Sequence, residues 1–227
     1  MTSSPLFAVA NDETLSRAIR NSQKTLVYVA PGITQAIVEA LQKQLNTQPN
    51  LQLTLIIDLD PEVYRLGYGT EEGLRALQTL AKDYQLDIRR QEGLRLGLLI
   101  SDDQTLLYAP TPLLIEAGSE SQTKPNALLI ESNTQLVKKL MYACGASGSL
   151  NDNTPPPNAA EIGQQAADVK AVEQSLQSLV NTPPKKFDVA RVERVFESKI
   201  QFVELELTGY RLSIKSINIP NDHTIEF

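Results

Sequence analysis

Apolar residues along the first two thirds of the chain alternate between short continuous runs and stripes at helical spacing. The short runs are rich in β-forming residues and predict buried strands, whereas the stripes predict amphipathic helices. The predicted strands cover 25–30, 51–58 and 86–91, and the predicted helices cover 12–22, 33–45 and 69–84. Because a helix between two strands returns the chain to the same end of the sheet, this alternation favours parallel β-α-β units.

The segments that follow depart from this alternation. The runs 94–101 and 105–110 are separated only by the sequence DDQ, so they predict an antiparallel hairpin. A further strand is expected over 127–132, and a helix over 133–145 that stops at Gly145.

A change of composition sets the predicted domain organisation. Residues 1–145 are predicted to form an α/β domain with a mixed, mostly parallel sheet flanked by helices. Residues 146–165 are rich in Ser, Asn and Pro and predict an exposed, flexible linker. Residues 166–227 predict a small α+β appendage with a helix over 166–180 and a hairpin over 201–219. The chain ends soon after that hairpin, so a truncated segment is one interpretation.

Charge and composition argue against several classes of protein. The net charge of −6 disfavours a surface broadly specialised for nucleic acid and leaves only a local basic patch as a candidate. No apolar run approaches the roughly 18 residues that span a bilayer, and the first residues lack the pattern of a signal peptide. A single cysteine excludes an internal disulfide. We therefore expect a cytoplasmic protein without membrane contact.

The segment RLGLLISDDQTLLYAPTP, at 95–112, carries a resemblance to a known family. Together with the order of helices and strands over residues 8–145, it resembles one copy of the phospholipase D superfamily domain. The signature of that family is His-x-Lys, four residues, Asp, and after six more residues a Gly-Ser-x-Asn-like run. The histidine falls on Arg95, the lysine on Gly97, the aspartate on Asp102 and the Gly-Ser-x-Asn run on 109–112. Only the aspartate is kept.

The resemblance implies a domain whose chemistry is lost. In the family, the histidine attacks phosphorus through a neutral ring nitrogen. Arg95 stays protonated and offers no lone pair, and Gly97 supplies no cation for the transition state. Asp102 lies in a predicted turn, where aspartate is common without any catalytic role. The leading hypothesis is a catalytically inactive phospholipase D-like domain that acts as a binding or self-association module.

Four residues form the predicted ligand-binding or phosphate-binding set: Arg89, Arg90, Arg95 and Asp102. The resemblance also implies that a single-copy member pairs as a homodimer, so we expect a homodimer. A nucleic-acid-binding accessory role, for example in a defence system, is one alternative. The C-terminal segment is a second place where nucleic acid or a protein partner is expected to bind.

The competing hypothesis is a divergent phosphodiesterase or nuclease in which Arg95, Asp102 and His223 do the work. His223 is the only histidine and is the fifth residue counted back from the last position. It is a poor candidate, because a reacting group must be held on a rigid element.

No metal or cofactor is predicted. Asp58 and Asp60 follow a predicted strand and could hold Mg²⁺, but Asp60 before Pro61 favours a helix cap. Cys144 ends a predicted helix, where a buried structural cysteine is favoured over a reactive thiolate. One His and one Cys give no zinc site.

Overall fold

The computed structural model describes residues 6–102, 104–112, 124–131, 135–146 and 160–182. The strands are β1 (Phe7–Ala8), β2 (Thr25–Ala30), β3 (Gln52–Ile57), β4 (Ile88–Arg90), β5 (Gly97–Ser101), β6 (Gln104–Tyr108), β7 (Ala127–Glu131) and β8 (Gln165–Ala167). The helices are α1 (Asp12–Asn21), α2 (Gln35–Thr47), α3 (Pro61–Arg65), α4 (Glu71–Tyr84), α5 (Gln135–Ala143) and α6 (Val169–Asn181).

The described strands form one mixed sheet in the order β1-β7-β6-β5-β2-β3-β4-β8. The predicted α/β class with a mixed sheet flanked by helices is confirmed, but the expectation of mostly parallel pairing is wrong. Only β2–β3 and β3–β4 are parallel, and the other five pairings are antiparallel. The reason is that the β5–β6 hairpin lies beside β2 rather than beside β4, and β7 and β8 extend the sheet by antiparallel pairing.

The helices begin where short polar side chains accept hydrogen bonds from the first turn. Asn11, Thr70 and Asp168 cap α1, α4 and α6. In each cap the side-chain oxygen accepts a hydrogen bond from the backbone N–H three residues further on, with N···O distances of 2.9–3.0 Å. Such caps stabilise a helix by roughly 1 kcal/mol and fix its first residue.

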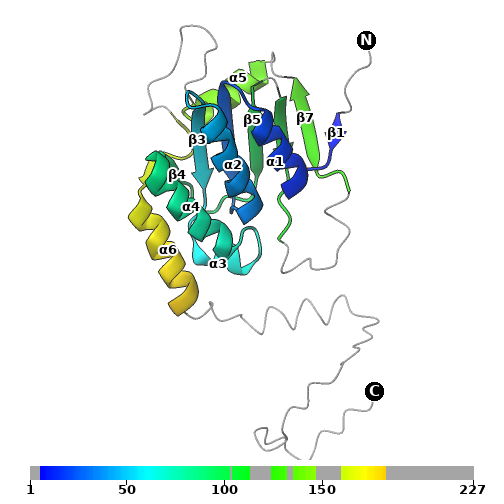
Figure 1. The fold of residues 1–227 in the computed structure, drawn as a ribbon. Coiled ribbons are helices and arrows are strands. Elements are labelled where there is room, and N and C mark those ends of the chain that lie inside the picture. The colour runs from blue at the N-terminus through cyan, green and yellow to red at the C-terminus, as the bar shows by residue number, and fades with distance from the viewer. Residues whose placement is uncertain (1–5, 103, 113–123, 132–134, 147–159, 183–227) are drawn as a thin grey trace, which may run out of the picture. The chain divides into compact units, whose positions relative to one another are not determined.

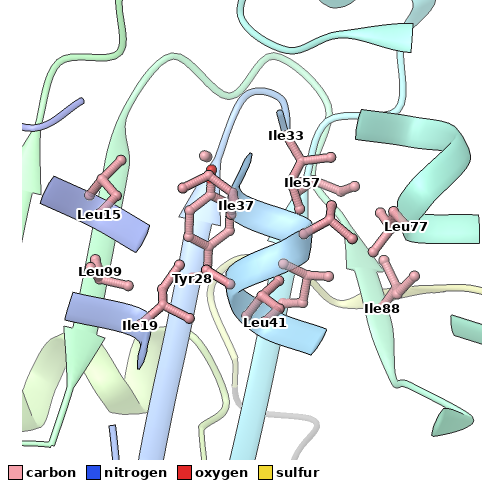
Figure 2. Close-up of a cluster of buried hydrophobic side chains, with 14 of the residues drawn as sticks. Leu15, Ile19, Tyr28, Ile33, Ile37, Leu41, Ile57, Leu77, Ile88 and Leu99 are labelled. Carbon is pink, nitrogen blue, oxygen red and sulfur yellow. The ribbon is translucent and has the colours of Figure 1, made fainter. Parts of the chain in front are cut away.

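The larger core lies between the sheet and the helices α1, α2, α4 and α6. Figure 1 shows α1, α2 and α4 side by side across this face of the sheet, and each helix contacts the next. Figure 2 shows Tyr28 of β2 among aliphatic side chains of α1 and α2, including Leu15, Ile19 and Ile37. The opposite face carries a smaller core in which Val137 and Met141 of α5 pack on β2, β3 and β5.

The compact unit extends further along the chain than the sequence indicated. The helix predicted over 166–180 was assigned to a separate C-terminal segment, whereas the structure pairs β8 with β4 and packs α6 against α3 and α4. Arg65 donates to the carbonyl oxygens of Ser178 and Leu179 at 3.1 and 3.2 Å and thereby holds the end of α6. β8 and α6 therefore belong to the same compact unit as the rest of the sheet.

Other predicted segments lie partly or wholly outside the described residues. Most of the predicted linker 146–165 and the whole predicted hairpin 201–219 are among them. Among the described helices, none combines the length and the apolar character that crossing a membrane requires.

Gly73 of α4 lies very close to the loop that leads into α2, and a substitution at this position tests that packing. A Cβ atom at this position would lie 2.3 Å from the backbone oxygen of Ile33. In a free helix, Gly→Ala stabilises by about 1 kcal/mol. Here we expect Gly73→Ala to lower the free energy of unfolding by about 1–3 kcal/mol, because backbone must move to admit the methyl group.

Urea denaturation measures this change. Thr79→Ala, on the exposed side of the same helix, is the control and should stay within about 0.5 kcal/mol of the parent. A Gly73→Ala protein more stable than the parent would contradict the close approach.

Candidate functional site

The motif segment folds as the predicted hairpin, with β5 and β6 paired from Gly97↔Tyr108 to Ser101↔Gln104. This places Arg95, Gly97 and the run 109–112 at the edge of the sheet where β2 and β3 end, which we call the C-terminal edge. Asp102 follows the far end of β5, about 16 Å away along a five-residue strand. The hairpin therefore separates Asp102 from Arg95, Gly97 and the run 109–112.

Asp102 secures the start of β2. Its carboxylate accepts the backbone N–H groups of Lys24 and Thr25 at 2.8 Å each, and that of Gln23 as well. Its φ of +47° lies in the left-handed region, which an aspartate in a turn tolerates. These contacts give Asp102 a structural task at the edge opposite the candidate site.

Arg95 is the counter-charge of a buried carboxylate. Its Nη1 lies 3.6 Å from Oδ2 of Asp58, whose side chain is only 1% exposed. Asp58 also accepts the N–H groups of Gly93 and Asp60 at 2.9 and 3.0 Å. The guanidinium lies over the ring of Tyr68, with its carbon 5.4 Å from the centroid. A charge so buried requires pairing, and Arg95 contributes that pairing.

The ring of Tyr108 excludes a longer side chain from position 97. Gly97 and Tyr108 are directly paired, and a Cβ atom on Gly97 would lie 2.2 Å from the Tyr108 ring. Tyr108 is 5% exposed and belongs to the larger core. The ring thus fills the space that a side chain at position 97 would need.

The remaining predicted arginines are not brought together with Arg95. Arg89 and Arg90 are neighbours on β4 and therefore point to opposite faces of the sheet. Arg89 Nη1 donates to the Cys144 carbonyl at 2.9 Å. Arg90 donates to Gln165 at 2.6 Å and to Glu92 at 2.9 Å. Each guanidinium has its own local partner, so the predicted set is dispersed in the structure.

Three further sequence candidates also have defined places. Asp60 caps α3 by accepting the Glu62 N–H at 3.0 Å, with Pro61 at the first helical position, as the cap interpretation predicted. Cys144 is 1% exposed, and burial raises the pKa of its thiol to about 11, although Arg89 acts in the opposite direction. His223 lies outside the described residues.

A search of the described residues finds no group of three or more His, Cys, Asp or Glu side chains arranged to hold a metal ion. The carboxylates at the C-terminal edge, Asp58 and Asp60, are engaged with backbone N–H groups instead.

The C-terminal edge contains a cavity of about 120 Å³, which we call the tyrosine cavity. Its walls come from the start of α1, the end of β2, the loop into α2, the loop before α4, and the end of β6. The lining residues used below are Asp12, Tyr28, Thr34, Tyr68 and Tyr108, and the run 109–112 contributes Pro110 and Thr111.

Unmatched hydroxyl groups face this cavity. The hydroxyl of Tyr108 lies beside that of Tyr28, but it makes no hydrogen bond of normal geometry within the described part of the chain. Thr34 Oγ1 also makes no hydrogen bond of normal geometry within the described residues, although the Asp12 carboxyl group lies close enough to interact with it. Tyr28 donates to the Gly32 carbonyl at 3.3 Å. Burial raises the pKa of both tyrosines far above the ordinary value, so both hydroxyls stay protonated at neutral pH.

Asp12 lies at the mouth of the tyrosine cavity. The residue is exposed, yet the surrounding protein removes enough water from its carboxyl group to raise the pKa, and the nearby Thr34 hydroxyl acts in the opposite direction. Because the carboxyl opens to solvent, it can meet a ligand without further rearrangement.

A second cavity, of about 360 Å³, lies between the end of β3 and α6. Several of its polar side chains already have partners. Ser175 donates to the Leu59 carbonyl at 2.6 Å, and Arg90 pairs with Glu92. The tyrosine cavity is therefore the better candidate for a ligand site.

Sequence reasoning did not identify the residues of the tyrosine cavity. The available signal was that Tyr28 and Tyr108 interrupt aliphatic strands shortly before prolines, at 31 and 110. Their proximity follows only from the placement of β5 between β2 and β6.

No protein-family model matches the chain, and no curated protein matches it. Two solved structures are similar at 12% identity and a TM-score of 0.40. One is TrmBL2, an archaeal chromatin protein described with a novel mode of DNA binding, over 63% of this chain and 50% of that one. The other is phosphatidylserine synthase from Haemophilus influenzae Rd KW20, over 78% and 43%.

This chain thus spans about half the length of either protein, or less. Similarity at this level does not establish a function for the chain.

The contact between Gly97 and Tyr108 can be tested by a double-mutant cycle. We expect Gly97→Ala to lower the free energy of unfolding by about 1–3 kcal/mol, because the methyl group overlaps the ring. In a Tyr108→Ala background the same change should cost at least about 1 kcal/mol less, since the overlapping ring is gone.

Urea denaturation of the four proteins gives the coupling energy. Gly97→Ala combined with Thr79→Ala, a distant exposed position, is the control pair and should be additive. Additivity of Gly97→Ala with Tyr108→Ala would show that the ring does not exclude the side chain.

Proposed function

We propose that this chain is a catalytically inactive phospholipase D-like domain that acts as a binding module. The observation that supports this most is the Tyr108 ring, which occupies the space beside Gly97 where the resembled family carries its lysine. Phosphoryl transfer depends on cationic groups that offset charge in the transition state. At this position the chain presents an apolar, buried surface instead.

The position of the resembled family's histidine supports the same proposal. Arg95 lacks a nucleophilic lone pair, and its charge is paired with buried Asp58. Asp102 is bound to backbone N–H groups at the opposite edge of the sheet. Changing one of these residues alone would therefore not restore the motif, since each has acquired a structural role. The edge still has a cavity with unmatched polar groups, which favours binding over self-association alone.

The alternative, a divergent phosphodiesterase, makes a different prediction in a direct assay. We expect the whole chain to show no turnover of bis(p-nitrophenyl) phosphate, single-stranded or duplex DNA, or RNA, with or without Mg²⁺ or Mn²⁺. The measurement is product release compared with a sample from a mock purification.

Metal-independent turnover that disappears in His223→Ala and survives in Cys144→Ala would refute inactivity and support the alternative. Binding of the same DNA without turnover, weakened by salt and by loss of Arg89 or Arg90, would support the nucleic-acid role in place of a small ligand.

We also propose that the chain forms a homodimer, as the resemblance implies. Phe7 and Leu128 are paired across the β1–β7 edge, on the face of the sheet that carries α5, and are 64% and 36% exposed. A second copy that covered them would remove this apolar surface from water.

Light scattering at micromolar concentration should give about twice the mass of the 25.0 kDa chain. Phe7→Glu should convert the dimer to monomer, because dimerisation would bury an unpaired charge. Val180→Glu, at a position of similar exposure on α6, is the matched control and should leave the mass unchanged. A parent protein of single-chain mass would refute the dimer.

A further inference from the structure

Buried hydrogen-bond donors at the tyrosine cavity indicate a ligand. Tyr108 is only 5% exposed, and its hydroxyl has no hydrogen-bond partner of normal geometry in the described residues. An unsatisfied hydroxyl in such a place costs about 1–3 kcal/mol. Thr34 lines the same cavity, and its Oγ1 also makes no hydrogen bond of normal geometry within the described residues, although it lies near the Asp12 carboxyl group. Each hydroxyl is a donor that a ligand in the cavity could use.

The start of α2 adds to this donor set. Thr34 is the N-cap, but its side chain makes no capping hydrogen bond, and the first turn holds no acidic residue. The first N–H groups of a helix lack partners within the helix, and its dipole favours negative charge at this end. For a 13-residue helix whose N-cap lines a cavity, these groups favour a carboxylate ligand.

Asp12, at the mouth of the cavity, favours a positively charged group on the ligand. A simple anion in the cavity would meet the charge of this carboxylate, whereas an ammonium group would pair with it. Arg95 lies over Tyr68, which lines the cavity, but it is paired with Asp58. The lining thus combines buried hydroxyl groups with the carboxylate of an exposed residue.

The volume limits the ligand to a few heavy atoms. A cavity of about 120 Å³ is somewhat smaller than an engineered cavity of about 150 Å³ that binds benzene. Glycine and alanine have five and six heavy atoms, and a larger molecule could insert one end of that size.

From these observations we propose that the tyrosine cavity binds the amino-carboxylate end of a small zwitterion, an α-amino acid. The ligand carboxylate accepts from Tyr108, Thr34 and the start of α2, and its ammonium group pairs with Asp12. This inference rests on the proposed binding role of the C-terminal edge, and it adds the chemical class of the ligand.

The test is a titration of the ¹⁵N-labelled whole chain with glycine and L-alanine, followed through its amide resonances. We expect saturable shifts centred on Thr34, Gln35 and Ala36, with dissociation constants of about 1 mM. Acetate, methylamine and glycerol are titrated in parallel up to about 10 mM, and each should bind at least about tenfold more weakly because it satisfies only part of the site.

Two variants remove one polar contact each without removing bulk. Tyr108→Phe and Asp12→Asn should each weaken glycine binding about tenfold. Tyr64→Phe is the matched control: Tyr64 is equally buried, and its hydroxyl also lacks a partner within the described residues, but it does not line the cavity. Glycine affinity should be unchanged in this variant.

Several outcomes would overturn the inference. Equal affinity for acetate would indicate an anion site, equal affinity for glycerol a polyol site, and an unchanged affinity in Tyr108→Phe a different location. Absence of any saturable shift with glycine and alanine would overturn it as well. These results are independent of the phosphodiester assay, so failure of this inference and failure of the proposed inactivity are distinguishable.

Discussion

A buried carboxylate organises the edge of the sheet on which the proposed function depends. Asp58 is almost completely removed from water, so its charge needs hydrogen bonds and a cation in its immediate surroundings. It obtains them from the backbone of Gly93 and Asp60 and from Arg95. These partners tie the end of β3 to the start of α3 and to the segment that enters β5. Arg95 is therefore a residue that the fold itself requires, because it supplies the cation for this buried carboxylate.

The same edge contains both a fully paired buried carboxylate and buried hydroxyl groups that lack hydrogen bonds of normal geometry within the described residues. Asp58 is paired with Arg95 and with two backbone N–H groups, whereas the hydroxyls of Tyr108 and Thr34 at the neighbouring tyrosine cavity make no hydrogen bond of normal geometry within the described residues. Natural proteins satisfy nearly all buried polar groups, so such groups gathered at one cavity need a physical reason. The ring of Tyr108 connects the two regions, because it closes the space next to Gly97 and directs its hydroxyl to the cavity.

Local signals in the sequence were sufficient for most individual elements. The hairpin over β5 and β6 followed from two apolar runs joined by a short polar turn. The cap at Asp60 followed from an aspartate placed directly before a proline. The pairing of β8 could not be predicted in this way. Its three residues, QAA, have no apolar alternation, and their place in the sheet depends on β4 and α6. The tyrosine cavity was missed for a similar reason, since Tyr28 and Tyr108 become neighbours only through the order of the strands.

The contact between Arg65 and α6 has a mechanical consequence. Its guanidinium holds the carbonyl oxygens at the last turn of α6, while the same side chain pairs with Glu62 in α3. A pulling force applied to the chain beyond Asn181 would load the hydrogen bonds between Arg65 and α6 before it loaded those of the sheet. Unfolding under such a force would begin with the detachment of α6, and the central strands would stay paired until the Arg65 hydrogen bonds had broken.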